Sequence, residues 1–542
     1  MNLSARGGPD LRARDPLPSL IRGWAQPSLA RNVIFNWLST GAMIAYSLFI
    51  TPVVVRGLDK QLYGVWSFLN GLLTYTDLLY LGLGAALIKY VAHHLAHRDD
   101  AAVNRLGSVV LSIYTVIGLL CLVAAVLVAP LVPRMFAQPL DPASATATTY
   151  TCVLLGARVL ALFIGSVFAG VLVGADRTDV ARVVPIVFTA LRFLAIPIFV
   201  TGPNPLLALA LVVTVSAVIE CVVMARLVRV VLSRFKTRWV WPHAPELRVL
   251  YGFGLQSFFV LTAVKLISYT DTTVIGVTLG AASVALYALP LQLIEYGRIG
   301  VNGIVGVLLP RLSALYAKGD TNRLGEAYLA AALVTCLIAA FLNVNIVFLG
   351  VPFLSLWVGP AFGEPTRWVL IFLAAASVLQ ALSTQVPLPF YQAMHLLRFP
   401  AVVLVVEGFA NLGLSVAWAP RFGITGVALA TALPALAISF LALPRHLCRH
   451  LEIPYSRLFR RTLLPVLLSI VTHSATFLLL NYLAQTTSYL ALFAKALAAA
   501  PGAAIGAGIG LCREDRESAL SFAKLGVSRC RQWARRAAGS LP

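Results

Sequence analysis

Charged residues are scarce in this chain. Only 12% of its 542 residues are Asp, Glu, Lys or Arg, whereas 59% are hydrophobic. A soluble globular domain carries about 25% charged residues. Together with a mean hydropathy of +0.86, this scarcity excludes an ordinary soluble protein and predicts an all-α polytopic membrane protein.

Motifs of reactive or metal-binding sites are also missing. The seven cysteines show no CxxC spacing, so we expect neither a disulfide framework nor a metal site. The first 30 residues lack the apolar core and cleavage site of a secretory signal, and we expect no cleaved signal. There is no HExxH, P-loop or nucleophile elbow, so we expect no catalytic residues, no enzyme activity and no cofactor.

Long apolar runs dominate the chain. Fourteen of them are long enough to cross about 30 Å of hydrocarbon as helices, at residues 33–55, 66–90, 107–133, 147–174, 183–202, 206–230, 250–278, 283–309, 327–357, 367–393, 399–419, 423–444, 462–484 and 488–511. The count falls to twelve if the last pair does not cross. We predict an N-terminal tail, a six-helix N-lobe, a linker, a six-helix C-lobe, a helix pair and a basic amphipathic tail, at residues 1–30, 31–232, 233–249, 250–445, 446–511 and 512–542.

Lysine and arginine are distributed unevenly between the predicted loops. With a cytoplasmic N-terminus, 32 of the 42 fall in inside segments, 5 in outside loops and 5 within spans. This positive-inside bias predicts that both termini are cytoplasmic. An anionic inner leaflet accounts for the net charge of +21, and we expect no nucleic-acid partner.

The two six-helix groups share features that indicate a parallel internal repeat. Each has a Leu-to-Tyr element in its first outside loop, at 58–63 and 279–287. Each also has a turn of basic and acidic residues after its second helix, at 97–106 and 318–324. Alternating-access transporters use such repeats and bind substrate at the repeat interface. A shared insertion topology is the alternative explanation.

Four cations lie inside predicted spans, namely Arg158, Arg192, Lys265 and Arg298. A charged side chain at bilayer depth costs at least about 3 kcal/mol, so these residues predict a hydrated interior that binds an anion. Arginine suits phosphate because its fork binds two oxygens. For Arg298 the alternative is neutralisation by Glu295, three residues earlier. Arg158 and Arg192 have no acidic residue one turn away, so their counter-ion must come from another helix or from a ligand.

Polar stripes mark several spans. Asn36, Asn70 and Asn302 each lie on such a stripe, in the first, second and eighth spans. Polar stripes are unfavourable against lipid tails, so we predict that these three side chains contact the substrate. The alternative is interhelical hydrogen bonding that only packs the bundle.

Acidic residues inside spans are candidates for coupling transport to a proton or sodium gradient. They are Asp77, Asp271, Glu295 and Glu407. The alternative is that they pair with the buried cations.

Pro387 and Pro389 follow a polar cluster at residues 380–385 in the tenth span. Prolines remove backbone donors and interrupt helices, which predicts a gate at this point. A simple kink is the alternative.

Several motifs occur in a characteristic order, namely Arg31-Asn32, Asn36-Trp37, Arg56-Gly57-Leu58, Tyr63-Gly64-Val65-Trp66, Leu81-Gly82-Leu83-Gly84, Tyr269-Thr270-Asp271, Leu309-Pro310-Arg311-Leu312-Ser313, Leu356-Trp357-Val358-Gly359-Pro360 and Phe422-Gly423-Ile424-Thr425-Gly426. Over residues 28–450 the chain resembles polysaccharide transporter proteins, the Wzx-type oligosaccharide flippases of the multidrug/oligosaccharidyl-lipid/polysaccharide exporter superfamily. The chain departs from them at Tyr80-Leu81, where the family often has Asp, and Asp77 is the candidate replacement.

The resemblance implies a flippase that exports an oligosaccharide linked to undecaprenyl pyrophosphate, such as an O-antigen or exopolysaccharide repeat unit, across the bacterial inner membrane by alternating access. Inner-membrane lipids, a glycan polymerase and a chain-length regulator are the implied partners. Alternatives are a multidrug/cation antiporter, which would need a net acidic cavity, and a peptidoglycan lipid-precursor flippase, which differs in the headgroup. A glycan polymerase or ligase would need catalytic groups on long outside loops, and the outside loops here are short.

Overall fold

The computed structural model describes residues 29–511 apart from 81, 307, 484–485 and 487. Residues 1–28 of the predicted N-terminal tail, the whole predicted C-terminal tail and the side chain of Asn36 lie outside the described part. Within it, every regular element is helical, in the order α2 (Leu29–Thr74), η1 (Tyr75–Tyr80), α3 (Leu83–Ala96), α4 (Asp100–Val128), α5 (Val132–Met135), α6 (Pro142–Gly174), α7 (Thr178–Phe199), α8 (Pro205–Val231), α9 (Ala244–Leu279), α10 (Ala281–Gly306), α11 (Leu309–Ala317), α12 (Thr321–Trp357), η2 (Pro360–Phe362), η3 (Glu364–Thr366), α13 (Arg367–Gln380), η4 (Ala381–Gln385), α14 (Pro387–Ala393), α15 (Arg398–Pro434), η5 (Ala435–Phe440), α16 (Leu441–His450), α17 (Tyr455–Leu458), η6 (Phe459–Leu463), α18 (Leu464–Leu483) and α19 (Tyr489–Gly510).

Ten segments of the described chain are long and apolar enough to cross a membrane, which confirms an all-α polytopic membrane protein. The number of fourteen crossings stays a prediction.

Two elements each contain a sharp break: α2 is interrupted at Asp59 (φ 60°, ψ 180°) and α15 at Gly423 (φ 61°, ψ −149°). The Asp59 carboxylate accepts hydrogen bonds from the backbone N–H groups of Gln61 and Leu62 at 2.7 and 2.9 Å and so starts the next helix. Both breaks fall at predicted outside turns.

The turns at the opposite end of the bundle share one conformation. The second and fourth helices of each half are followed by a residue with positive φ, namely Arg98, Asp176, Gly319 and His395. After the first and third of these, Asp99 and Asp320 cap the next helix by accepting a backbone N–H at 2.9 and 3.0 Å. The same turns therefore recur in the same order in both halves, as a parallel repeat requires.

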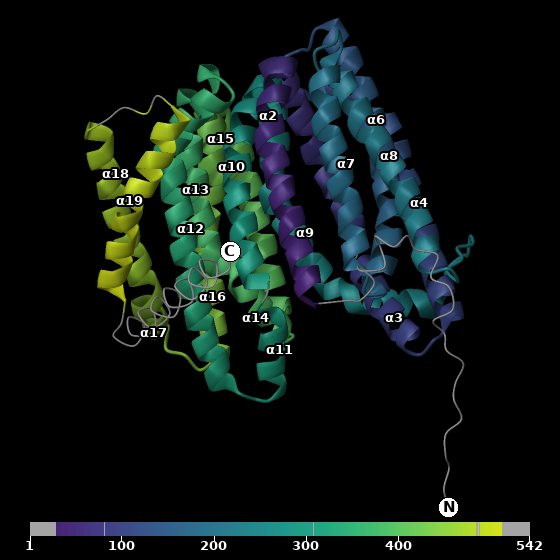
Figure 1. Ribbon diagram of the computed structural model, residues 1–542. Helices are drawn as coiled ribbons and strands as arrows, with labels where there is room; N and C mark the ends of the chain where they lie inside the picture. Colours follow the sequence, from purple (N-terminus) through teal and green to yellow (C-terminus); the bar gives the residue numbers. More distant parts are fainter. Residues whose placement is uncertain (1–28, 81, 307, 484–485, 487, 512–542) are drawn as a thin grey trace, which may run out of the picture.

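The two halves lie side by side, and α18 and α19 cover the far flank of the second half (Figure 1). The halves touch at the predicted outside end, where a Cβ on Gly64 would lie 1.7 Å from the carbonyl oxygen of Ala281. The Ala137 N–H also donates to the carbonyl of Gly276 there, at 3.3 Å. Toward the opposite end, which carries the turns at Arg98, Asp176, Gly319 and His395, the halves diverge (Figure 1). We call them the N-lobe (α2 to α8) and the C-lobe (α9 to α16).

Candidate functional site

Two arginines of the N-lobe lie close together on neighbouring helices. Arg192 on α7 pairs with Glu220 on α8, with 3.5 Å between Nη2 and Oε2, and its Nε donates to the carbonyl of Phe188 at 3.2 Å. Arg158 on α6 acts electrostatically on Arg192, and its buried Nε has no hydrogen-bond partner among the described residues. Both guanidinium groups also lie within electrostatic range of the Tyr46 hydroxyl on α2. Two cations therefore share one carboxylate beside the first helix.

A second ion pair joins the two lobes. Lys265 Nζ on α9 lies 2.9 Å from Asp77 Oδ2 on η1, and 4.9 Å from the centre of the Tyr269 ring. The side chains of this pair are 25% and 50% exposed, respectively. Both residues lie near the middle of predicted spans, so the pair links the two lobes at mid-bundle depth.

The third ion pair lies within one helix. Arg298 Nη1 on α10 is 2.6 Å from Glu295 Oε1, which is the neutralisation considered above for this arginine. Arg298 also lines a cavity of about 240 Å³ inside the C-lobe, together with Asn302, Pro389 and Glu407. The Glu407 carboxylate is buried and accepts a hydrogen bond from the hydroxyl of Ser439.

These pairs correct the expected surplus of positive charge. Arg192, Lys265 and Arg298 each have an acidic partner. Within the described part of the chain, Arg158 is the one member of the four without an ion pair. Of these four cations, Arg158 is therefore the surplus one, and it lies in the N-lobe near Arg192, which Glu220 neutralises.

Asp271 lies in a polar cluster without a cationic partner among the described residues. It is 2% exposed and accepts hydrogen bonds from Tyr287, Thr431 and Ser415 at 2.5, 2.7 and 3.3 Å. Asn411 donates to Thr431 at 3.0 Å, while its own Oδ1 is buried without a partner in the described part. Carboxylate, amide and hydroxyl oxygens are ligands for hard cations, and a buried carboxylate surrounded by neutral groups can also hold a proton.

Polar stripes of the two lobes meet along α2 and α10. Gln292 donates to Ser47 and Thr51 at 2.7 and 3.0 Å, and Tyr296 donates to Ser47 at 2.6 Å. Asn70, by contrast, donates to the carbonyl of Trp66 in its own helix at 2.8 Å. The stripes of the first and eighth helices therefore line each other, whereas the Asn70 amide bonds within its own helix.

The predicted proline gate contains a π-helical turn. Residues Ala381–Gln385 form this turn, and α14 begins at Pro387. The N–H of Val386 reaches the carbonyl of Ala381 at 3.1 Å, five residues back. Single π-turns inside helices often mark functional positions. Pro389 faces the C-lobe cavity that also contains Arg298.

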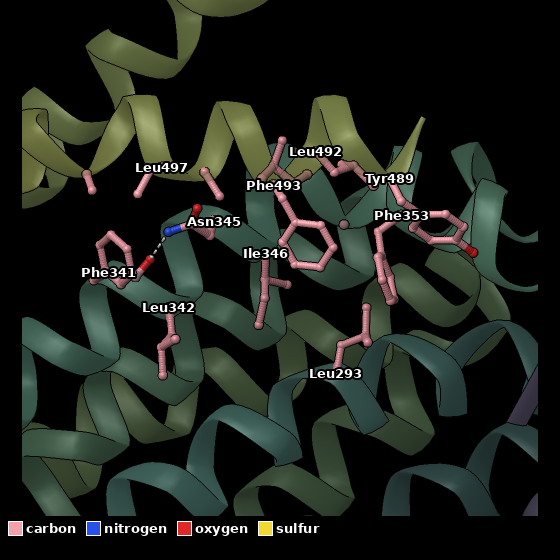
Figure 2. A pocket seen from close by; sticks show the side chains of 14 residues that line it. Leu293, Phe341, Leu342, Asn345, Ile346, Phe353, Tyr489, Leu492, Phe493 and Leu497 are labelled. Carbon is pink, nitrogen blue, oxygen red and sulfur yellow. Dashed lines mark hydrogen bonds between the residues drawn. The ribbon is translucent and has the colours of Figure 1, made fainter. Parts of the chain in front are cut away.

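An apolar groove of about 520 Å³ lies between α10, α12 and α19 (Figure 2). Large apolar side chains line it, including Leu293, Phe353, Phe493 and Leu497. Asn345 is its amide-bearing member, and its Nδ2 donates to the carbonyl of Phe341. Leu293 lies two residues before Glu295 on α10, so the groove and the Glu295–Arg298 ion pair flank the same helix.

Several functional candidates were missed by reasoning from sequence. They are Glu220 as the partner of Arg192, the groove, and the residues around Asp271. A pattern that could have indicated the last group is Asn411 and Ser415, four residues apart and hence on one face of a helix.

Residues 29–316 match the model of a family described as polysaccharide biosynthesis protein. The chain is 23% identical over 413 residues to the uncharacterized membrane protein EpsK of Bacillus subtilis (strain 168), covering 74% of this chain and 80% of EpsK. The fold is similar to an inward-facing multidrug resistance MATE family transporter of the MOP superfamily (TM-score 0.65, 16% identity, 75% of this chain and 95% of the other). It is also similar to the lipid II flippase MurJ in an inward closed conformation (TM-score 0.65, 13% identity, 88% and 98%). At these identities the structural likeness shows the fold alone.

Proposed function

The chain belongs to the polysaccharide biosynthesis protein family, and on that basis we propose that it is a flippase for an oligosaccharide linked to undecaprenyl pyrophosphate. Its substrate crosses from the cytoplasmic to the periplasmic leaflet of the bacterial inner membrane. The repeat of two lobes, in contact at one end and diverging at the other (Figure 1), supports alternating access. The protein acts as a transporter and catalyses no bond cleavage.

The surplus cation carries this proposal. Among the described residues, Glu220 is the one carboxylate that Arg158 and Arg192 share, so an anion placed beside Arg158 would complete the charge balance. A pyrophosphate offers several oxygens that a guanidinium fork binds in pairs. The unpartnered Nε of Arg158 is a donor for such an oxygen.

The two ends of the substrate have matching surfaces. The polar seam of Ser47, Thr51, Gln292 and Tyr296 offers hydrogen-bonding groups to sugar hydroxyls. The apolar groove between α10, α12 and α19 (Figure 2) suits a polyprenyl chain, since pockets lined by aliphatic and aromatic side chains bind apolar ligands. Both surfaces flank α10.

The Asp271 cluster is the coupling-ion site in this proposal. Its carboxylate, hydroxyl and amide oxygens suit sodium, and its isolation from cations suits a proton. In the N-lobe the charge balance argues against a drug/cation antiporter. Such a protein needs a net acidic cavity, and here Asp77 pairs with Lys265 while the carboxylate of Glu220 lies beside both Arg158 and Arg192.

Complementation of a strain that lacks its export flippase tests the proposal. R158Q should abolish surface glycan while the lipid-linked oligosaccharide accumulates, and R158K should retain part of the export. R367Q is the matched control, because Arg367 pairs with Glu364 at the predicted outside end. Normal glycan in R158Q at wild-type protein level would contradict the proposal.

A further inference from the structure

The segment between α8 and α9 runs along α4 in register with it. We call residues 233–241 the strap. The backbone N–H groups of Lys236, Arg238 and Val240 donate to side-chain oxygens of Asn104, Ser108 and Ser112 at 2.9, 3.0 and 3.2 Å, respectively. Four residues of helix rise about 6 Å, and two residues of extended chain advance about 6.6 Å. The strap is therefore extended, and every second residue faces α4.

Other contacts show that α4 is shaped to receive the strap. Phe235 is 5% exposed and packs on Gly107, where a Cβ would lie 2.8 Å from the Phe235 ring. Asn104 Nδ2 donates to the carbonyl of Arg234 at 3.0 Å, and Arg234 Nη1 lies 3.0 Å from Asp100 Oδ2. Gly107, Asn104 and Asp100 of α4 thus all contribute to holding the strap against this helix.

The strap turns basic and aromatic groups away from the helix bundle. Lys236 and Arg238 are exposed, and Trp239 and Trp241 are 62% and 67% exposed. Because alternate residues of an extended chain point their N–H groups to opposite sides, those of Thr237 and Trp239 point away from α4. Neither has a hydrogen-bond partner among the described residues. The outer edge therefore combines backbone donors with two cations.

The position of α4 places this edge at the membrane surface. α4 packs on α6 and α3 at the outer side of the N-lobe (Figure 1). Its 29 residues span about 43 Å, which exceeds about 30 Å of hydrocarbon, and Ser112 lies about 18 Å from its first residue. The part of the strap at Lys236 and Arg238, beside Asn104 and Ser108, thus lies within the first ~13 Å of α4, the length by which the helix exceeds the hydrocarbon.

We propose that the strap binds the phosphate of an acidic phospholipid in the leaflet at this end of the bundle. The phosphate oxygens accept the N–H groups of Thr237 and Trp239, and Lys236 and Arg238 supply the opposite charge. Trp239 and Trp241 lie at the headgroup level, where tryptophan is enriched. This lipid is a resident ligand of the linker between the lobes and is distinct from the transported substrate.

Native mass spectrometry of the purified full-length protein, incubated with phosphatidylglycerol and phosphatidylcholine, tests the proposal. K236Q/R238Q should weaken phosphatidylglycerol retention about 30-fold, from about 1 kcal/mol for each cation near an anionic surface. S108A/S112A keeps both charges but removes two acceptors that dock the strap, and it should also weaken retention. R311Q/K318Q is the matched control, since these exposed cations lie at the same end of the C-lobe.

The expected pattern is loss of phosphatidylglycerol in the first two variants and retention within about twofold in the control. Wild-type retention in K236Q/R238Q would overturn the proposal. Equal loss in R311Q/K318Q would overturn it as well, because general surface charge would then account for the binding. Wild-type retention in S108A/S112A would show that the docked strap is not the site.

Discussion

Removing one partner of the Asp77–Lys265 pair should shift the balance between the arrangements of the two lobes. The charges lie 2.9 Å apart, on opposite lobes. Coulomb's law gives about 1.4 kcal/mol at this distance in water and about 6 kcal/mol at an effective dielectric constant of about 20. Because Asp77 is half exposed, the lower part of this range applies. We expect about 1–2 kcal/mol, a factor of about 5–30 in a two-state equilibrium.

Each single variant also leaves an uncompensated charge at mid-bundle depth, which costs more than losing the pair. D77N and K265Q should therefore each perturb the lobes more than the double variant D77N/K265Q does. Spin labels at the exposed turn residues His97 and Lys318, in a background without the native cysteines, would report the distance distribution between the lobes. Additive effects of the two single variants would refute the reasoning, because independent sites show no coupling.

Three further predictions concern other parts of the molecule. D271N should remove the dependence of transport on the coupling ion, measured as export with and without the sodium and proton gradients; unchanged ion dependence would exclude Asp271 from coupling. G64A should force the outside ends apart and lower transport at least tenfold, because its Cβ would meet the Ala281 carbonyl at 1.7 Å, whereas G413A has open space and should be silent. L497W should fill the apolar groove and weaken binding of a polyprenyl phosphate in a lipid-binding assay; wild-type affinity would place the chain elsewhere.

The transmembrane spans and the intramembrane cations Arg158 and Lys265 could be predicted from the sequence, because both depend on local properties. A run of about 20 apolar residues predicts a helix without knowledge of its neighbours. The cost of burying Arg158 or Lys265 is likewise independent of what lies beside them. The alternative that Glu295 neutralises Arg298 was also local, since the two share one turn of helix.

The partners across the bundle could not be predicted in this way. Asp77 and Lys265 are 188 residues apart and Arg192 and Glu220 are 28 apart, so only the packing of the helices brings them together. The hydroxyl group of Thr431 gave no signal, because such groups in helices commonly bond to their own backbone. The docking of the strap depends on both the extended segment and the stripe of α4 that faces it, so neither segment alone predicts it.

The most direct test of the central claim is the affinity of the purified protein for undecaprenyl pyrophosphate, compared between wild type and R158Q. The account predicts a loss of about 10-fold to 100-fold in R158Q, because a hydrogen bond to a charged group contributes about 1.5–3 kcal/mol. R367Q, at the exposed ion pair with Glu364, should bind like wild type. Equal affinity of R158Q and wild type would contradict the account.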